Sequence, residues 1–161
     1  MTTSSIPAAI DYLVQAATTA FGSSVQVTDG PLVSGTEPTA QDQLWIGYSP
    51  LNEELPAVVG DQDFAALGAR SRNENYAILC CLIQWSGDPA TKALRDSAFA
   101  LLATVETLLR GTGGNPGDCT LGGAVLYSQI SGGIEVMPTE DTTGAGLAIQ
   151  FHVQCRARLT S

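Results

Sequence analysis

The residues of this chain that could do chemistry are few and stand apart from one another. Asp61 and Asp63 form a D-x-D pair that could offer two carboxylates to a divalent cation, which needs more ligands than two. His152 and Cys155 have H-x-x-C spacing, but their side chains would point to opposite faces of a β-strand. We therefore predict no metal site, and we expect the two aspartates at a solvated strand entry.

Catalytic roles are equally hard to fill from this sequence. His152 is the single histidine, so any serine or cysteine nucleophile would depend on it as a base, and no G-x-S-x-G elbow is present. The glycine-rich GTGGNPG segment has no Lys-Ser/Thr pair and opens no helix, which is not typical of a phosphate-binding loop. We predict no enzyme activity and no cofactor. An enzyme would need a ligand pocket around His152 or around Asp61 and Asp63.

Composition and charge favour one folded domain spanning residues 1–161. The apolar fraction is 44%, and 16 acidic residues oppose 7 basic ones, for a net charge of −9. An acidic surface repels nucleic acid and anionic lipid. No apolar run approaches the roughly 20 residues that span a bilayer, and the N-terminus lacks the features of an export signal. We expect a protein that is made in a cytoplasm and has no membrane contact, and we expect its four cysteines to be reduced structural thiols.

The hydrophobic periodicity predicts two main helices and a set of extended segments. The first helix starts after Ser5, with Pro7 in its first turn, and stops at Gly22. The second is opened by Asp88-Pro89, carries an apolar stripe and ends at Gly111. A long loop is expected over 31–42, a hairpin tip over 70–75 and a turn over 138–144. Extended segments are expected over 25–28, 43–49, 57–69, 76–85, 123–136 and 146–159.

Two of these segments say most about the expected architecture. The 76–85 strand is apolar on both faces, so it needs a second layer from its own chain or from a neighbouring subunit. The 146–159 segment alternates between apolar and polar residues, which is typical of an outer antiparallel strand with one buried face. The chain is therefore expected to be an α+β protein with a mixed, mainly antiparallel sheet flanked by the two helices.

Several polar or aromatic residues are candidates for contact with a partner. Phe99 interrupts the polar face of the second helix: exposure would imply a partner surface, whereas cover by a loop would make it ordinary core. Arg70 and Arg72 lie at the expected hairpin tip, and Arg156 and Arg158 share the polar face of the last strand. Each arginine pair is either solvated charge or a partner for carboxylates of another subunit, and Asp61 and Asp63 complete the candidate set.

Taken together, these elements resemble a known family. The early helix, the segments GDQDFAALGARSRNENYAILCCLIQWSGD and RDSAFALLATVETLLR, and the closing FHVQCRARL are similar to phage tail-terminator proteins. The likeness extends to minor tail or tail-completion proteins of long-tailed phages and prophages of actinobacteria. It covers residues 6–159, except for the 31–42 loop and the 111–118 connection.

The resemblance implies a tail-terminator-like fold and a role in the virion. The protein would assemble in the host cytoplasm into a homo-oligomeric ring, a hexamer, at the head-proximal end of the tail. There it would contact the tail tube protein, stop tube polymerisation and join the head–tail connector proteins of the neck. DNA would pass through the lumen without specific binding. Two alternatives stay open: a head–tail connector or stopper of the neck, and a monomeric cytoplasmic binding module that uses the long loop.

Overall fold

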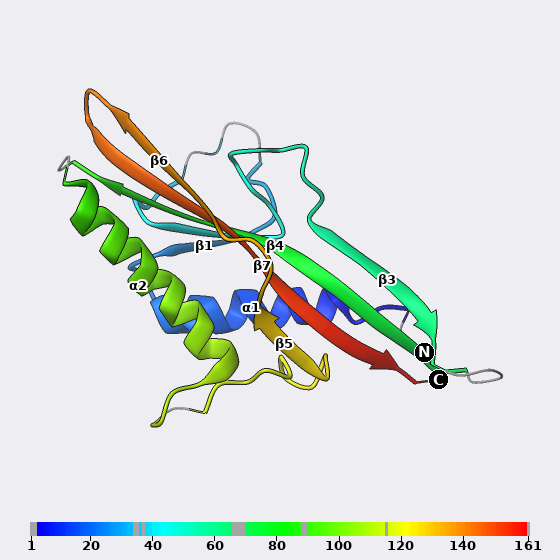
Figure 1. Cartoon of the computed structure of the whole chain (residues 1–161). Helices are drawn as coiled ribbons and strands as arrows, with labels where there is room; N and C mark the ends of the chain where they lie inside the picture. Colours follow the sequence, from blue (N-terminus) through cyan, green and yellow to red (C-terminus); the bar gives the residue numbers. More distant parts are fainter. Residues whose placement is uncertain are drawn as a thin grey trace.

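The computed structural model describes residues 3–33, 36, 38–65, 70–87, 90–114 and 116–160. Within these ranges two helices flank one seven-stranded, mostly antiparallel sheet, which confirms the expected α+β fold (Figure 1). Neither helix is long and apolar enough to span a membrane. In chain order the elements are α1 (Ile6–Phe21), β1 (Gln26–Asp29), β2 (Gln43–Ile46), β3 (Val58–Phe64), β4 (Arg72–Ser86), α2 (Thr91–Arg110), β5 (Tyr127–Ile130), β6 (Glu135–Asp141) and β7 (Gly144–Leu159).

The sheet is built around a long antiparallel pair, β4 and β7. Their pairing begins with Arg72 opposite Leu159 and ends with Ser86 opposite Ala145. On the other side of β4, β2 pairs with its C-terminal half and β3 with its N-terminal half. On the other side of β7, β6 pairs with its N-terminal half and β5 with its C-terminal half. β1 adds a short parallel strand outside β2. The sheet thus has two ends that share the same central pair.

Three expectations about the last third of the chain are wrong. β7 is not an outer strand, because β4 lies on one side of it and β5 and β6 lie on the other. The single segment expected over 123–136 is interrupted after Ile130, so two short strands replace it. The turn expected over 138–144 is mostly strand, because β6 continues to Asp141 and only Thr142 and Thr143 separate it from β7.

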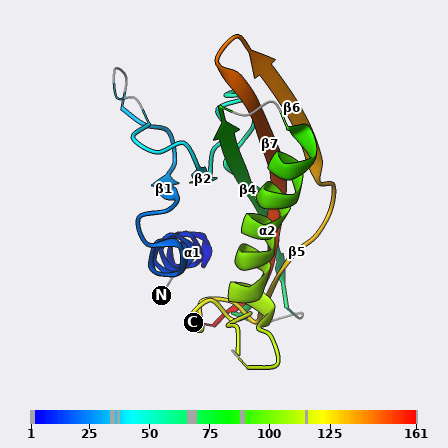
Figure 2. The ribbon, with the colours of Figure 1, turned by 90° about the vertical axis from the view of Figure 1, so that its left-hand side faces the viewer.

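Both helices cover the same face of the sheet and enclose the main core. α1 packs on β1 and β2, while α2 packs on β4, β5 and β7 (Figure 2). The strand residues that face them alternate along β4 and β7, as the sequence predicted, because successive side chains point to opposite faces. The buried residues of this core include Leu13, Ala17, Phe21, Leu94, Ala98, Leu102, Val105, Tyr76, Ile78, Cys80, Leu82, Ile149, Phe151 and Val153.

The helix boundaries largely follow the sequence signals. α1 starts after Ser5 and ends at Gly22, whose φ of 58° lies in the left-handed region that favours glycine. α2 ends at Gly111, but it begins at Thr91 with Ala90 at the N-cap position. Asp88 and Pro89, which were expected to open this helix, lie outside the described residues. Lys92 and Asp96, four residues apart on the exposed face of α2, form an ion pair.

The described residues cover only part of the opposite face of the sheet. Around Trp45, Cys81 and Ala148 a second, smaller cluster is closed by Leu32, Tyr48, Ile83 and Met137. The extended segment expected over 43–49 is shorter in the structure, because β2 ends at Ile46. Gly47 turns the chain at a φ of 74°, and the ring of Tyr48 then packs against Trp45. Among the described residues, the doubly apolar β4 therefore receives its second layer near Cys81, from Leu32 before β2, Tyr48 after β2 and Met137 of β6.

Candidate interaction surface

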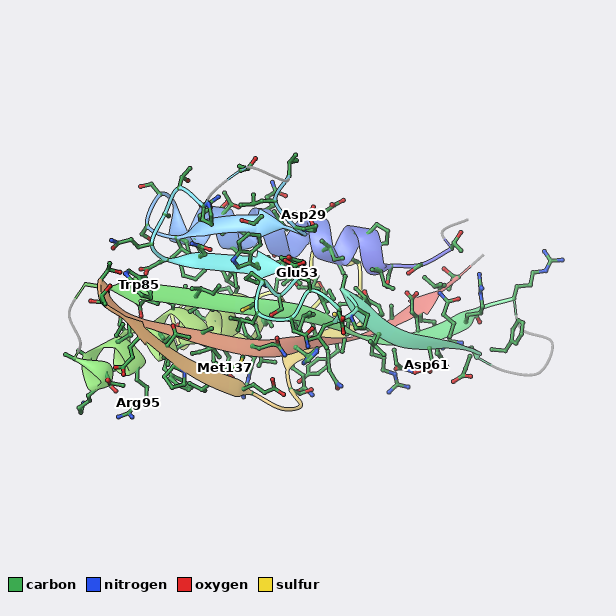
Figure 3. All side chains as sticks on the ribbon, turned by 90° about the horizontal axis from the view of Figure 1, so that it is seen from above. Asp29, Glu53, Asp61, Trp85, Arg95 and Met137 are labelled. Atoms are coloured by element: carbon green, nitrogen blue, oxygen red, sulfur yellow. The ribbon has the colours of Figure 1, made fainter. Side chains whose placement is uncertain are left out.

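At the other end of the β4–β7 pair, around Asn75 and Arg156, the side of the sheet that faces away from the helices is exposed. Trp85 and Asp61 mark the covered and the open end in Figure 3. We call this surface the open face. By strand register and alternation it carries Val59, Asp61, Asp63, Asn73, Asn75, Ala77, Tyr127, Gln129, Gln154, Arg156 and Arg158.

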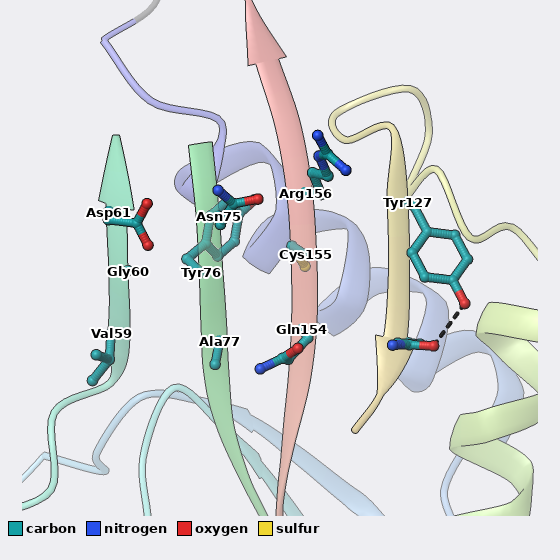
Figure 4. A pocket seen from close by; sticks show the side chains of 11 residues that line it. Val59, Gly60, Asp61, Asn75, Tyr76, Ala77, Tyr127, Gln154, Cys155 and Arg156 are labelled. Atoms are coloured by element: carbon teal, nitrogen blue, oxygen red, sulfur yellow. Dashed lines mark hydrogen bonds between the residues drawn. The ribbon is translucent and has the colours of Figure 1, made fainter. Parts of the chain in front are cut away.

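Four strands contribute to the open face in the order β3, β4, β7, β5 (Figure 4). They form a shallow depression of about 540 Å³, lined by most of these side chains. One row across the strands contains Asp61, Asn75, Arg156 and Tyr127. The hydroxyl of Tyr127 donates a hydrogen bond to Gln129 Oε1 over 2.7 Å, which holds the ring along its own strand. The surface is thus rich in polar groups and bounded by two partly apolar edges.

The charges on this face have no ion-pair partner within the described residues. There the ion pairs are Lys92 with Asp96 and Arg110 with Glu106, both on α2. Asp61 and Asp63 are exposed on β3, and Arg156 and Arg158 are exposed on β7. The structure therefore brings four of the seven predicted contact residues onto one surface, with carboxylates and guanidinium groups on different strands.

The other three predicted residues lie elsewhere. Phe99 is 40% exposed on the outer side of α2, so it is not ordinary core, and α2 covers the opposite face of the sheet. Arg72 lies inside β4 rather than at a hairpin tip, and its Nη1 donates to Gln62 Oε1 over 3.0 Å. Arg70 is exposed at a bend just before that strand. These residues do not share a site with the open face.

Sequence reasoning missed two apolar residues of the open face, Val59 and Tyr127. Val59 is 61% exposed on β3 and Tyr127 is 45% exposed on β5, at the two edges of the depression. An exposed valine in a strand is ordinary by itself, and the sequence provides no signal for the pairing of β5 with β7. Only the register places Tyr127 beside Arg156.

A buried carboxylate on the helix side holds this end of the sheet in place. Glu74 is only 2% exposed. It accepts hydrogen bonds from the hydroxyl of Ser4 (2.6 Å), the backbone N–H and hydroxyl of Ser5 (2.8 and 2.7 Å) and Gln62 Nε2 (2.7 Å). Its charge also lies at the N-terminus of α1, where the helix dipole favours an anion. The network therefore ties α1 to β3 and β4 behind the open face.

The charge of Glu74 is favoured by these bonds. Burial alone would raise the pKa of Glu74, but the hydrogen bonds from Ser4, Ser5 and Gln62 outweigh it and hold that pKa below its ordinary value. The hydroxyl of Ser5 also lies 2.9 Å from that of Tyr76. We conclude that Glu74 is ionised at neutral pH and that its role in this network is structural.

Close packing also fixes β3 against β4. A side chain at Gly60 would collide with Tyr76 and with the backbone oxygen of Asn75. Glycine at this point lets β3 lie flat beside β4, so that Asp61 and Asp63 stay in register with the open face.

The reactive side chains do not converge on the open face. His152 lies on β7 on the side away from the helices, whereas Cys155 points into the main core, as the spacing predicted. The four cysteines are free; burial raises the pKa of Cys81 to about 11 and that of Cys155 to about 12. Among the described residues, no three His, Cys, Asp or Glu side chains are grouped to hold a metal ion. What the surface offers is charge, hydrogen bonding and shape.

No family model matches the chain, and no curated protein matches it in sequence.

Proposed function

We propose that this protein is a phage tail terminator, a structural protein that forms a ring on the head-proximal end of the tail tube. In this role it stops tube polymerisation and joins the tube to the neck of the head. The observation that carries the proposal is the open face of a sheet that is buried on its other side. This face presents exposed apolar residues together with carboxylates and arginines that form no ion pair among the described residues. A surface of this kind supports assembly through shape and charge.

The two sides of the molecule suit two different contacts. A subunit in a ring must touch its neighbours through two distinct patches and must also meet the tube and the neck. The open face and its edges supply charged patches for neighbours, and Phe99 supplies an apolar contact on α2. We assign Phe99 to the tube or neck contact because α2 lies on the other side of the sheet.

Net charge supports the proposed passage of DNA through the ring. With 16 acidic and 7 basic residues, the chain repels a polyanion unless its bases gather on one surface. We therefore propose an acidic lumen along which the genome slides without specific binding. An assembled ring with a basic channel would contradict this part of the proposal.

Electron microscopy of the purified protein, alone and mixed with tail tubes of the same phage, tests the function. We expect rings that cap one end of each tube, and shorter tubes when the protein is present during polymerisation. A protein that stays monomeric at every concentration and leaves tubes uncapped would overturn the proposal. Rings that bind neck proteins but leave tube growth unchanged would identify a neck connector instead.

A single variant separates tube contact from ring formation. Phe99→Ser removes an exposed ring and leaves the buried stripe of α2 intact, so we expect a folded protein that forms rings but caps tubes at least about tenfold less efficiently. Ala103→Ser, at another exposed position of the same helix, is the matched control and should cap tubes like the wild type. Equal capping by both variants would remove Phe99 from the contact.

A further inference from the structure

The charges of the open face are separated across the sheet, with the negative charges on β3 and the positive charges on β7. Two rows cross the sheet, and in each the carboxylate lies on β3 and the guanidinium on β7. One row runs Asp61, Asn75, Arg156 and the other Asp63, Asn73, Arg158. Neutral asparagines of β4 separate the charges. One side of the sheet is therefore acidic and the other side is basic.

Both charged sides lie at or near sheet edges. Within the described chain β3 pairs only with β4, so the outer edge of β3 is free. The first residue of β5, Tyr127, lies opposite Arg156, so in the described part of the chain no strand pairs with Arg158 on that side. Arg158 is thus at the edge, and Arg156 is one strand further in, behind Tyr127. Free strand edges are ready to meet another chain.

The spacing of the two charged pairs matches. Asp61 and Asp63 are two residues apart on one face of β3, as Arg156 and Arg158 are on β7, so each pair repeats at about 6.8 Å. β3 and β7 are both antiparallel to β4 and therefore run parallel to each other. A copy displaced sideways along the sheet would bring Asp61 to the row of Arg156 and Asp63 to the row of Arg158, in the same order.

We propose that copies of this chain associate head to tail, with Asp61 and Asp63 of one copy against Arg156 and Arg158 of the next. The inference rests on the proposed ring and specifies the contact that builds it. Val59 and Tyr127, exposed at the two edges, add apolar contact beside the charges. Because the acidic and the basic side differ, the interface is heterologous, and such a contact closes a ring when the rotation from one copy to the next closes.

Other pairings of the same edges are disfavoured by charge. A two-fold contact of β3 with β3 would set Asp61 and Asp63 against the same carboxylates. The free edge of β6 is also acidic, with Glu135 and Glu140 exposed, so β3 against β6 repeats the repulsion. The basic side of β7 is the complementary one.

Charge reversal tests the contact without any tail protein. Variant A carries Asp61→Arg and Asp63→Arg, and variant B carries Arg156→Glu and Arg158→Glu. Each alone sets like charges against each other, so we expect each to associate at least about tenfold more weakly than the wild type in sedimentation velocity. A mixture of A and B restores opposite charges at every contact and should recover association, as should one chain carrying all four changes.

Asp11→Arg with Asp29→Arg reverses two exposed carboxylates on α1 and β1 and should associate like the wild type. Association of A or B at wild-type strength, or failure of the A and B mixture while both are folded, would overturn the contact. If a reversal unfolds the chain, Asp61→Asn with Asp63→Asn replaces it, and association should then weaken and lose part of its salt dependence.

The outcome for this contact is separable from the outcome for the proposed function. Wild-type protein that associates by this contact but never caps a tube would support the contact and overturn the function. If the wild type caps tubes and variants A and B cap them equally well, the function is supported and the contact is overturned. A wild type that is monomeric alone and on tubes overturns both.

Discussion

The same two strands, β4 and β7, form both faces of the centre of the sheet, but the two faces differ in burial. On the helix side Tyr76, Ile78, Phe151 and Val153 are buried beneath α1 and α2. On the other side, the same stretch of backbone presents Ala77, Gln154 and Arg156 to an open depression. Alternation along a strand thus lets one segment contribute both to a core and to an exposed polar surface. Stability and assembly should therefore respond to different substitutions on neighbouring residues.

The largest effect should come from a matched pair on β7. Phe151→Ala opens a cavity in the main core and should lower the free energy of unfolding by about 3–5 kcal/mol. Gln154→Ala, three residues later on the open face, should change it by no more than about 0.5 kcal/mol. Urea unfolding of both variants measures the contrast. Similar losses would mean that the open face is covered in solution.

The next effect concerns Glu74, which holds α1 to β3 and β4. Glu74→Gln keeps the shape but replaces a charged acceptor of four hydrogen bonds, so we expect a loss of about 1–3 kcal/mol in the free energy of unfolding. Its neighbour Asn75 is exposed on the open face, and Asn75→Ala should be close to neutral. Equal stability of the wild type and Glu74→Gln would show that the network contributes little.

The pH dependence of stability sharpens the same comparison. The folded pKa of Glu74 lies below the ordinary value of 4.5, so the unfolded chain binds more protons between the two values. Its stabilisation is complete above about pH 4.5 and is lost as pH falls through the folded pKa. Unfolding curves from pH 7 to pH 3 should therefore show the gap between the wild type and Glu74→Gln narrowing. A constant gap would contradict the assignment.

The smallest effect should be a difference in thiol reactivity between Cys80 and Cys81, which are buried by different layers on the two faces of the sheet. Cys80 lies under the helices, and Cys81 lies on the opposite side, under the thinner layer formed with Tyr48 and Leu32. Local opening should expose Cys81 first, so a thiol reagent should modify it at least about tenfold faster than Cys80 in the native protein. Cys80→Ala and Cys81→Ala variants in a background of Cys119→Ser and Cys155→Ala each keep one thiol, so mass spectrometry gives the two rates separately. Equal rates would indicate that both thiols react only through global unfolding.

The sequence alone determined the local features of this protein. Both helices, their glycine stops and the buried faces of β4 and β7 follow from periodicity within one segment, because the side-chain repeat is a property of the local backbone. The helical wheel placed Phe99 on the polar face of α2, but only the structure shows that no loop covers it, because the side chain is 40% exposed. These features depend only on residues a few positions apart.

Only the tertiary structure decided which strands are neighbours. A strand with one polar face has the same sequence pattern at the edge of a sheet as in the centre of a sheet with one exposed side. The pattern therefore predicted an outer position for β7, which is wrong. The break between β5 and β6 and the row that aligns Asp61 with Arg156 likewise depend on pairing between residues far apart in the chain. Strand register is chosen by the packing of the whole sheet, and no local repeat in the sequence encodes it.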